Sequence, residues 1–116
     1  MKEIILALLF FYSSLSYGEV DDYCSKKDAV GEVEAERISS AESGYTVSKK
    51  GRSYFYSAPD DKCKTSKFIV FKDQVDAYME YNSFHYIIYF GKNGVTTEGW
   101  VKSEHLKENG YGVGND

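Results

Sequence analysis

Four side chains in this 116-residue sequence have the chemistry for a nucleophilic site. They are the thiols of Cys24 and Cys63 and the imidazoles of His85 and His105. A catalytic cysteine must be unpaired and must lie beside an activating base. Two cysteines in a small chain with an export signal instead favour one disulfide. We therefore expect a bond between Cys24 and Cys63, and neither histidine has an obvious nucleophile beside it.

The sequence patterns for other catalytic sites and for metal sites are weak or missing. The acidic pairs Asp21-Asp22 and Asp60-Asp61 lie at turns, but calcium loops need a longer series of oxygen ligands at fixed spacing. The chain has too few cysteines and histidines for zinc spacings, and it has neither a glycine-rich phosphate loop nor a Gly-x-Ser-x-Gly elbow. The sequence therefore predicts no metal, no cofactor and no catalytic residue, and we expect a protein that is not an enzyme.

The amino-terminal residues are typical of a secretory signal peptide. An apolar run from Ile4 to Tyr12 follows one lysine, and the small residues Ser16 and Gly18 occupy the positions that a signal peptidase reads. A membrane anchor would need about 20 apolar residues, and a buried core segment is the other alternative. We predict a signal peptide over residues 1–18, cleavage before Glu19, no membrane span afterwards, and a periplasmic or secreted bacterial protein.

The net charge of −4 includes no basic stripe of the kind that binds a phosphate backbone, so we expect no nucleic-acid partner. Acidic residues concentrate in the early mature region at Glu32, Glu34, Glu36 and Glu42. Such a run is usually a solvated helix face. The alternative is a docking surface for a basic partner.

The mature chain divides near Gly44 into a helical pattern and a strand pattern. The segment Ser25-Lys26-Lys27-Asp28 can form a capping box, apolar residues then recur at helical spacing, and Gly44 can stop the helix. We predict one helix from about Lys26 to Ser43. Cys24 precedes its first turn, so a bond to Cys63 would tie the helix entrance to the strands.

After Gly44 the composition shifts to tyrosine, phenylalanine and β-branched residues between turn signals. A short helical turn over residues 103–106 follows the last long strand. Five strands are predicted: Ser53 to Ala58, Lys67 to Phe71, Val75 to Tyr81, Phe84 to Phe90, and Thr96 to Val101.

The stretch from Arg52 to Leu106 resembles the bacterial SH3 domain. The resemblance implies a mainly β fold, a small five-stranded SH3-like barrel preceded by one helix, and a module that binds rather than catalyses. Phe84 stands where such domains usually have Trp, and the acidic and aromatic motif for proline-rich peptides is absent. The segments that carry the resemblance are Ser57-Ala58-Pro59, Phe68-Ile69-Val70, Lys72-Asp73-Gln74-Val75, Glu98-Gly99-Trp100-Val101 and His105-Leu106.

These boundaries predict four regions: the signal peptide 1–18, a helical segment 19–50, the barrel 51–107 and a flexible tail 108–116. The predicted fourth strand is apolar on both faces, so we expect Ile87 and Tyr89 to face the core. Tyr86, Ile88 and Phe90 then need a cover, which is either the helix or another protein.

Aromatic side chains are the candidate binding surface, because Tyr and Trp give large rigid contact area at low entropic cost. The alternative is that these rings fill a small core. The candidate residues are Tyr54, Tyr56, Tyr78, Tyr81, Phe84 and Trp100.

Two functions are consistent with these patterns. The first is a monomeric, non-catalytic periplasmic module that recognises cell-wall peptide or an envelope protein through the aromatic surface. The second is a periplasmic inhibitor or immunity protein whose acidic helix and tyrosines block a secreted toxin or a cell-wall hydrolase.

Overall fold

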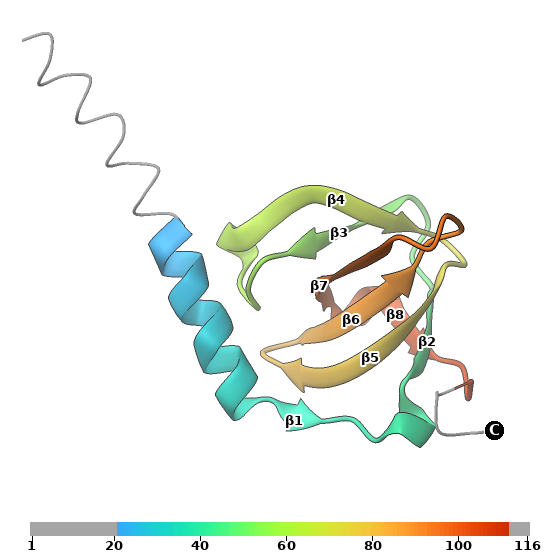
Figure 1. The fold of residues 1–116 in the computed structure, drawn as a ribbon, viewed down its shortest axis with the longest axis horizontal. Coiled ribbons are helices and arrows are strands. Elements are labelled where there is room, and N and C mark those ends of the chain that lie inside the picture. The colour runs from blue at the N-terminus through green and yellow to red at the C-terminus, as the bar shows by residue number, and fades with distance from the viewer. Residues whose placement is uncertain (1–20, 112–116) are drawn as a thin grey trace, which may run out of the picture.

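Strands dominate the part of the chain that the computed structural model describes, residues 21–111. The antiparallel strands form one eight-stranded sheet in the order β4-β3-β7-β6-β5-β2-β8, with β1 paired to β5, and the sheet curls into a half-barrel (Figure 1). The strands are β1 (Glu36–Arg37), β2 (Gly44–Val47), β3 (Arg52–Tyr56), β4 (Lys64–Val70), β5 (Gln74–Tyr81), β6 (Phe84–Phe90), β7 (Thr96–Lys102) and β8 (Leu106–Glu108). Short 3-10 turns are η1 (Ser40–Glu42), η2 (Asp61–Cys63) and η3 (Ser103–His105).

The predicted signal peptide and residues 112–116 of the predicted tail lie outside the described residues. Within residues 21–111, no helix is both long enough and apolar enough to cross a membrane.

The main core lies on the concave face of the curled sheet. Because side chains alternate between the two faces of a strand, every second residue of β6 and β7 points into it. In β5 this alternation holds as far as Ala77, where the register with β6 shifts. Ile87 of β6 is fully buried there and Tyr89 packs against the same cluster, as expected. The buried members of this cluster are Val47, Phe55, Ile69, Val75, Ala77, Ile87, Val101 and Leu106.

The five predicted strands correspond to β3 through β7, with ends that differ by up to about three residues. The sheet also contains three short strands that the sequence did not predict: β1, β2 and β8. Strand β2 matters most, because it pairs with β5 on one side and with β8 on the other. Such short segments carry too few residues for a recognisable alternation, and their pairing partners are remote in sequence.

The predicted helix over residues 26–43 is wrong at both ends. Residues 21–34 are helical, and the chain then turns into β1. The last helical bond is donated by the Ala35 amide to Gly31, and the Ile38 amide instead donates to the Tyr78 carbonyl. Pairing with β5 therefore replaces the helix after residue 34, where Ser39 and Ser40 give the helix little intrinsic support.

The helix packs against the convex face of the sheet at the end where the β3–β4 and β5–β6 connections lie (Figure 1). Trp100 of β7 is fully buried beneath it and donates its indole N–H to Asp28 Oδ1 at 2.7 Å. A Cβ atom at Gly31 would lie 2.9 Å from Pro59 Cγ and 3.0 Å from Trp100 Cζ2. Glycine is therefore required for the close approach of the helix.

The predicted disulfide between Cys24 and Cys63 is confirmed. It joins the first described turns of the helix to η2, with the two Cα atoms 5.8 Å apart. Both cysteines are buried, together with Ala58. The bond fixes the β3–β4 connection to the helix.

Reduction of this disulfide should destabilise the protein by about 4 kcal/mol, because a closed loop of 39 residues no longer limits the unfolded chain. The free energy of unfolding in urea, measured with and without reductant, tests this. Two thiols that react freely with iodoacetamide in the untreated protein would contradict the bond.

Replacement of Gly31 by Val should cost roughly 1–3 kcal/mol, because the added methyl groups collide with Pro59 and Trp100. The matched control is Ala29→Val, which places the same side chain on an exposed position of the same helix. Urea unfolding followed by the fluorescence of Trp100 measures both variants. Equal stability of the two would show that the helix does not pack as described.

Candidate functional site

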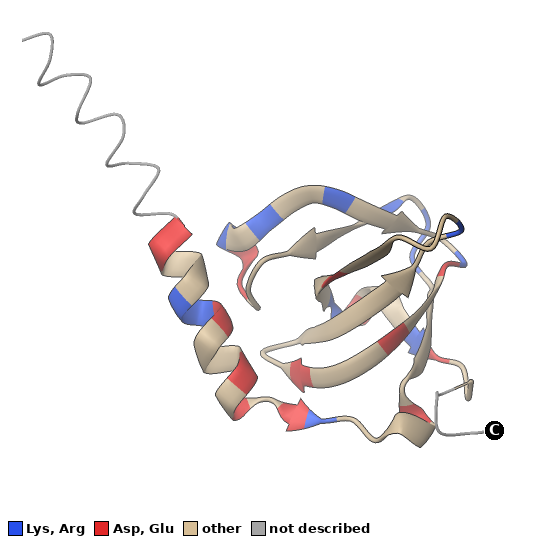
Figure 2. Ribbon diagram, viewed as in Figure 1, with Lys and Arg blue, Asp and Glu red and all other residues tan. Residues whose placement is uncertain are grey.

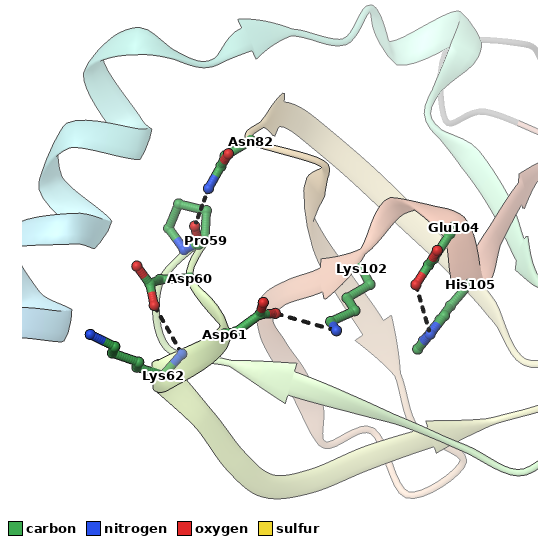
Figure 3. A network of polar contacts seen from close by, with 8 residues as sticks. All are labelled: Pro59, Asp60, Asp61, Lys62, Asn82, Lys102, Glu104 and His105. Carbon is green, nitrogen blue, oxygen red and sulfur yellow. Dashed lines mark hydrogen bonds and ion pairs between the residues drawn. The ribbon is translucent and has the colours of Figure 1, made fainter.

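A concavity lies at the helix end of the sheet, where three connections meet. Residues before and within η2 form one wall, the β5–β6 turn forms another, and the end of β7 with η3 forms the third (Figure 3). We call this feature, of about 670 Å³, the groove. Its lining residues are Asp60, Asp61, Lys62, Asn82, Ser83, Phe84, Lys102, Ser103 and Glu104.

The η2 wall is fixed by Asp60. Its Oδ1 accepts the Lys62 amide at 2.9 Å as an N-terminal cap, and its Oδ2 accepts the Tyr23 hydroxyl of the helix at 2.6 Å. The bond from Tyr23, and then that from the Lys62 amide, hold the pKa of Asp60 below its ordinary value. Asp60 is therefore an anion whose oxygens are already engaged.

The β5–β6 turn forms the second wall. Asn82 and Ser83 both have positive φ, at 52° and 67°, which matches a two-residue hairpin turn of the I′ type. The Asn82 side-chain amide donates to the Pro59 carbonyl at 3.0 Å. This bond joins two walls that are remote in sequence and holds the groove open between them.

The groove carries charges of both signs. Lys102 Nζ lies 3.3 Å from Asp61 Oδ1, and the hydrogen bond to Asp61 raises the pKa of Lys102 above its ordinary value. The Asp61 side chain is 79% exposed, so this ion pair is weak and can exchange for a ligand. Lys62 and Glu104 are exposed at the same rim. The groove thus offers ammonium and carboxylate groups that a peptide with both charges can match.

A Ser–His–Glu arrangement lies beneath the groove. His85 Nδ1 lies 2.7 Å from Ser103 Oγ, and His85 Nε2 lies 3.4 Å from Glu80 Oε2. Such a set can activate a serine when backbone N–H groups stabilise the oxyanion. Here the Ser103 amide already donates to the Ser83 carbonyl at 2.9 Å. His85 is 5% exposed, and we interpret the arrangement as a structural link between β5, β6 and η3.

Five of the six predicted aromatic residues lie together in one cluster, and three of the six are buried. Tyr56, Phe84 and Trp100 are buried in one cluster on the convex face with Met79, and Tyr54 and Tyr81 pack against that cluster. The exposed member of the six is Tyr78, at 38%. Of the buried rings, Phe84 lies at the floor of the groove and Tyr56 lines a second, shallower hollow.

The predicted acidic helix face is also distributed differently. Glu32 and Glu34 lie on the helix, but Glu36 lies on β1 and Glu42 on η1 because the helix ends at residue 34. All four are exposed. They therefore do not form a single helix face.

The sequence analysis missed the polar groove residues Asp61, Asn82, Ser83 and Lys102 as a group. Three turn signals in the sequence mark their positions, at residues 59–61, 81–83 and 103–106. The strand pairing order, which brings these turns to one end of the sheet, could not be predicted from the sequence. In the described part of the chain, no three His, Cys, Asp or Glu side chains gather in a way that could hold a metal ion.

Comparisons with protein-family models, with curated proteins and with solved structures found no match. The function is therefore inferred from the geometry of the described residues.

Acidification from pH 7.5 to 5 should destabilise the protein. Burial lowers the pKa of His85 below 6.5, against the opposing effect of Glu80, and partial burial together with Lys49 lowers that of His105. An unfolded chain then binds protons that the folded protein excludes, so stability is complete above about pH 6.5 and is lost as the pH falls towards the folded-state pKa values. Asp60 titrates below this range.

The free energy of unfolding of wild type and His85→Asn, measured at half-unit pH intervals, tests this. We expect a shallower pH dependence in the variant, with a residual slope from His105. The same slope in both proteins would contradict the buried neutral state of His85.

Proposed function

We propose that the protein is an exported, non-catalytic SH3-like binding module that recognises cell-wall peptide through the groove. The single observation that carries the proposal is the groove itself, in which three connections bring two cations and three carboxylates to one end of the sheet. A short peptide with both carboxylate and amine groups complements these charges.

The SH3-like assignment rests on connectivity as well as on the quoted segments. Strands β5, β6 and β7 pair consecutively, η3 follows β7, and β8 then pairs with β2, which returns to β5. The segments that resemble a bacterial SH3 domain thus belong to one continuous antiparallel sheet. The buried disulfide supports export, because such bonds persist in oxidising compartments.

The groove does not suit a proline-rich ligand. Recognition of polyproline helices uses exposed aromatic side chains as the walls of a groove. The one aromatic residue that lines this groove, Phe84, is 5% exposed. Seven of the nine lining residues instead carry a charged or hydroxyl group, which favours a peptide with polar groups.

Purified protein should sediment with isolated peptidoglycan sacculi in low-salt buffer. Lys102→Gln removes the ammonium group of the groove and should raise Kd about tenfold, which corresponds to about 1.4 kcal/mol. The matched control is Lys107→Gln, the same change at an exposed lysine of β8 outside the groove, and it should leave Kd within about twofold.

A sedimentation series at increasing sacculus concentration gives the three Kd values, and thermal unfolding checks that each variant is folded. No sedimentation of wild type, or equal weakening by the two lysine variants, would reject the groove as the site for cell-wall peptide.

A further inference from the structure

The convex face of the sheet is only half covered by the helix. Near the helix, Tyr86 and Trp100 are neighbours across β6 and β7 and form an edge-to-face ring contact at 5.4 Å. Asp28, Gly31 and Ala35 of the helical segment pack over this part of the sheet. From the sequence we expected either the helix or another protein to cover Tyr86, Ile88 and Phe90. In the structure, the helix covers only the first half of the convex face of β6.

Beyond the helix, large apolar side chains remain in contact with solvent. Phe90 at the end of β6 is 58% exposed, Val95 in the β6–β7 turn is 66% exposed, and Tyr78 on β5 is 38% exposed. This turn lies at the end of the sheet opposite the helix (Figure 1). We call the surface formed by Tyr78, Ile88 and Phe90, together with Asp76 and Glu98, the open face. Contiguous exposed apolar surface of this kind on a monomer commonly marks an interaction site.

Two carboxylates flank the open face. Asp76 of β5 and Glu98 of β7 are both direct cross-strand neighbours of Ile88. Since adjacent strands lie about 4.8 Å apart, the two acidic residues are separated by roughly 10 Å, with the apolar side chain between them. Within residues 21–111 neither carboxylate forms an ion pair with a lysine or arginine. Burial, and then Asp76 and Glu98, raise the pKa of Tyr78, so both carboxylates act on its ring hydroxyl.

The negative charge continues towards the helix. Glu98 and Asp28 line a shallow hollow of about 270 Å³ with Tyr56 and Tyr86, and Lys67 of β4 lies on its other wall. Figure 2 shows acidic residues on β5 and basic residues along β4, and the helix carries residues of both signs. The convex face beside Ile88 is therefore both apolar and acidic, and Lys64 and Lys67 lie on strand β4.

We propose that the open face docks a basic segment of a partner protein. In the complex, a Lys or Arg side chain lies between Asp76 and Glu98, and an apolar side chain of the partner packs on Ile88 and Phe90. The rings of Tyr78 and Phe90 give the cation aromatic faces as well as carboxylates. Charge complementarity selects this occupant, because an acidic lipid surface would be repelled, and a second copy in a two-fold arrangement would oppose like charges.

This surface is separate from the groove and requires no cell-wall ligand. The groove lies at the helix end of the sheet, whereas the open face lies towards the β6–β7 turn. The two sites can therefore be tested independently by different variants of the same protein.

The test uses the oxidised protein labelled with ¹⁵N and a synthetic probe peptide, Ac-Lys-Leu-Arg-Phe-Lys-NH₂. A peptide with glutamate at the three basic positions is the control probe. The basic peptide should give saturable amide shifts on β5, β6 and β7, and the acidic peptide should give none. Higher salt should weaken binding, since the contacts are partly exposed.

Glu98→Gln should weaken binding of the basic peptide at least fivefold, and Phe90→Thr should do so through loss of apolar contact. Glu108→Gln removes the same charge from exposed β8, and Lys102→Gln alters the groove, so both should bind as wild type does. Shifts confined to the groove, equal binding of both peptides, or wild-type affinity in Glu98→Gln would overturn the proposal. Concentration-dependent self-association that Phe90→Thr abolishes, without peptide binding, would overturn it in favour of a second copy.

Discussion

Burial of Trp100 beneath the helix is the contact on which the rest of this structure depends. The indole N–H has a half-buried acceptor in Asp28, and the absence of a side chain at Gly31 lets the helix approach the ring. An unpaired buried N–H would cost free energy, so burial of the Trp100 ring depends on the acceptor that the Asp28 carboxylate provides. The same helix holds the β3–β4 connection through the disulfide and through the bond from Tyr23 to Asp60. Its position therefore fixes one wall of the groove.

The placement of the helix also explains why the two proposed surfaces differ in chemistry. At the helix end, three connections expose polar and charged groups over a floor formed by the edge of a buried aromatic cluster. At the other end, β6 continues past the helix with apolar side chains on its convex face, and Phe90 is 58% exposed. One short helix on a longer sheet thus leaves a polar groove and an apolar, acidic face.

Much of the fold could be predicted because its signals are local. The disulfide followed from the cysteine count, and β6 from an unbroken apolar run between turn signals. The helix end at residue 34 depended on pairing of residues 36–38 with β5, a contact 40 to 44 positions away that no local pattern encodes. The surroundings of the candidate aromatic residues could not be predicted for a related reason. Trp100 and Tyr56 have the composition of an interface, but their burial depends on where the helix lies, and groove residues such as Lys102 and Asn82 become neighbours only through strand order.

The indole N–H of Trp100 provides the most direct test, because the protein has a single tryptophan and hence a single indole signal in a proton–nitrogen spectrum. Hydrogen exchange of that group should be slowed at least a hundredfold relative to a free indole in the oxidised protein, and Asp28→Ala should remove most of the protection while the amides of β6 stay protected. Exchange at the rate of a free indole in the wild-type protein would contradict the burial of Trp100 under the helix, and with it the division of the convex face into a covered part and an open part.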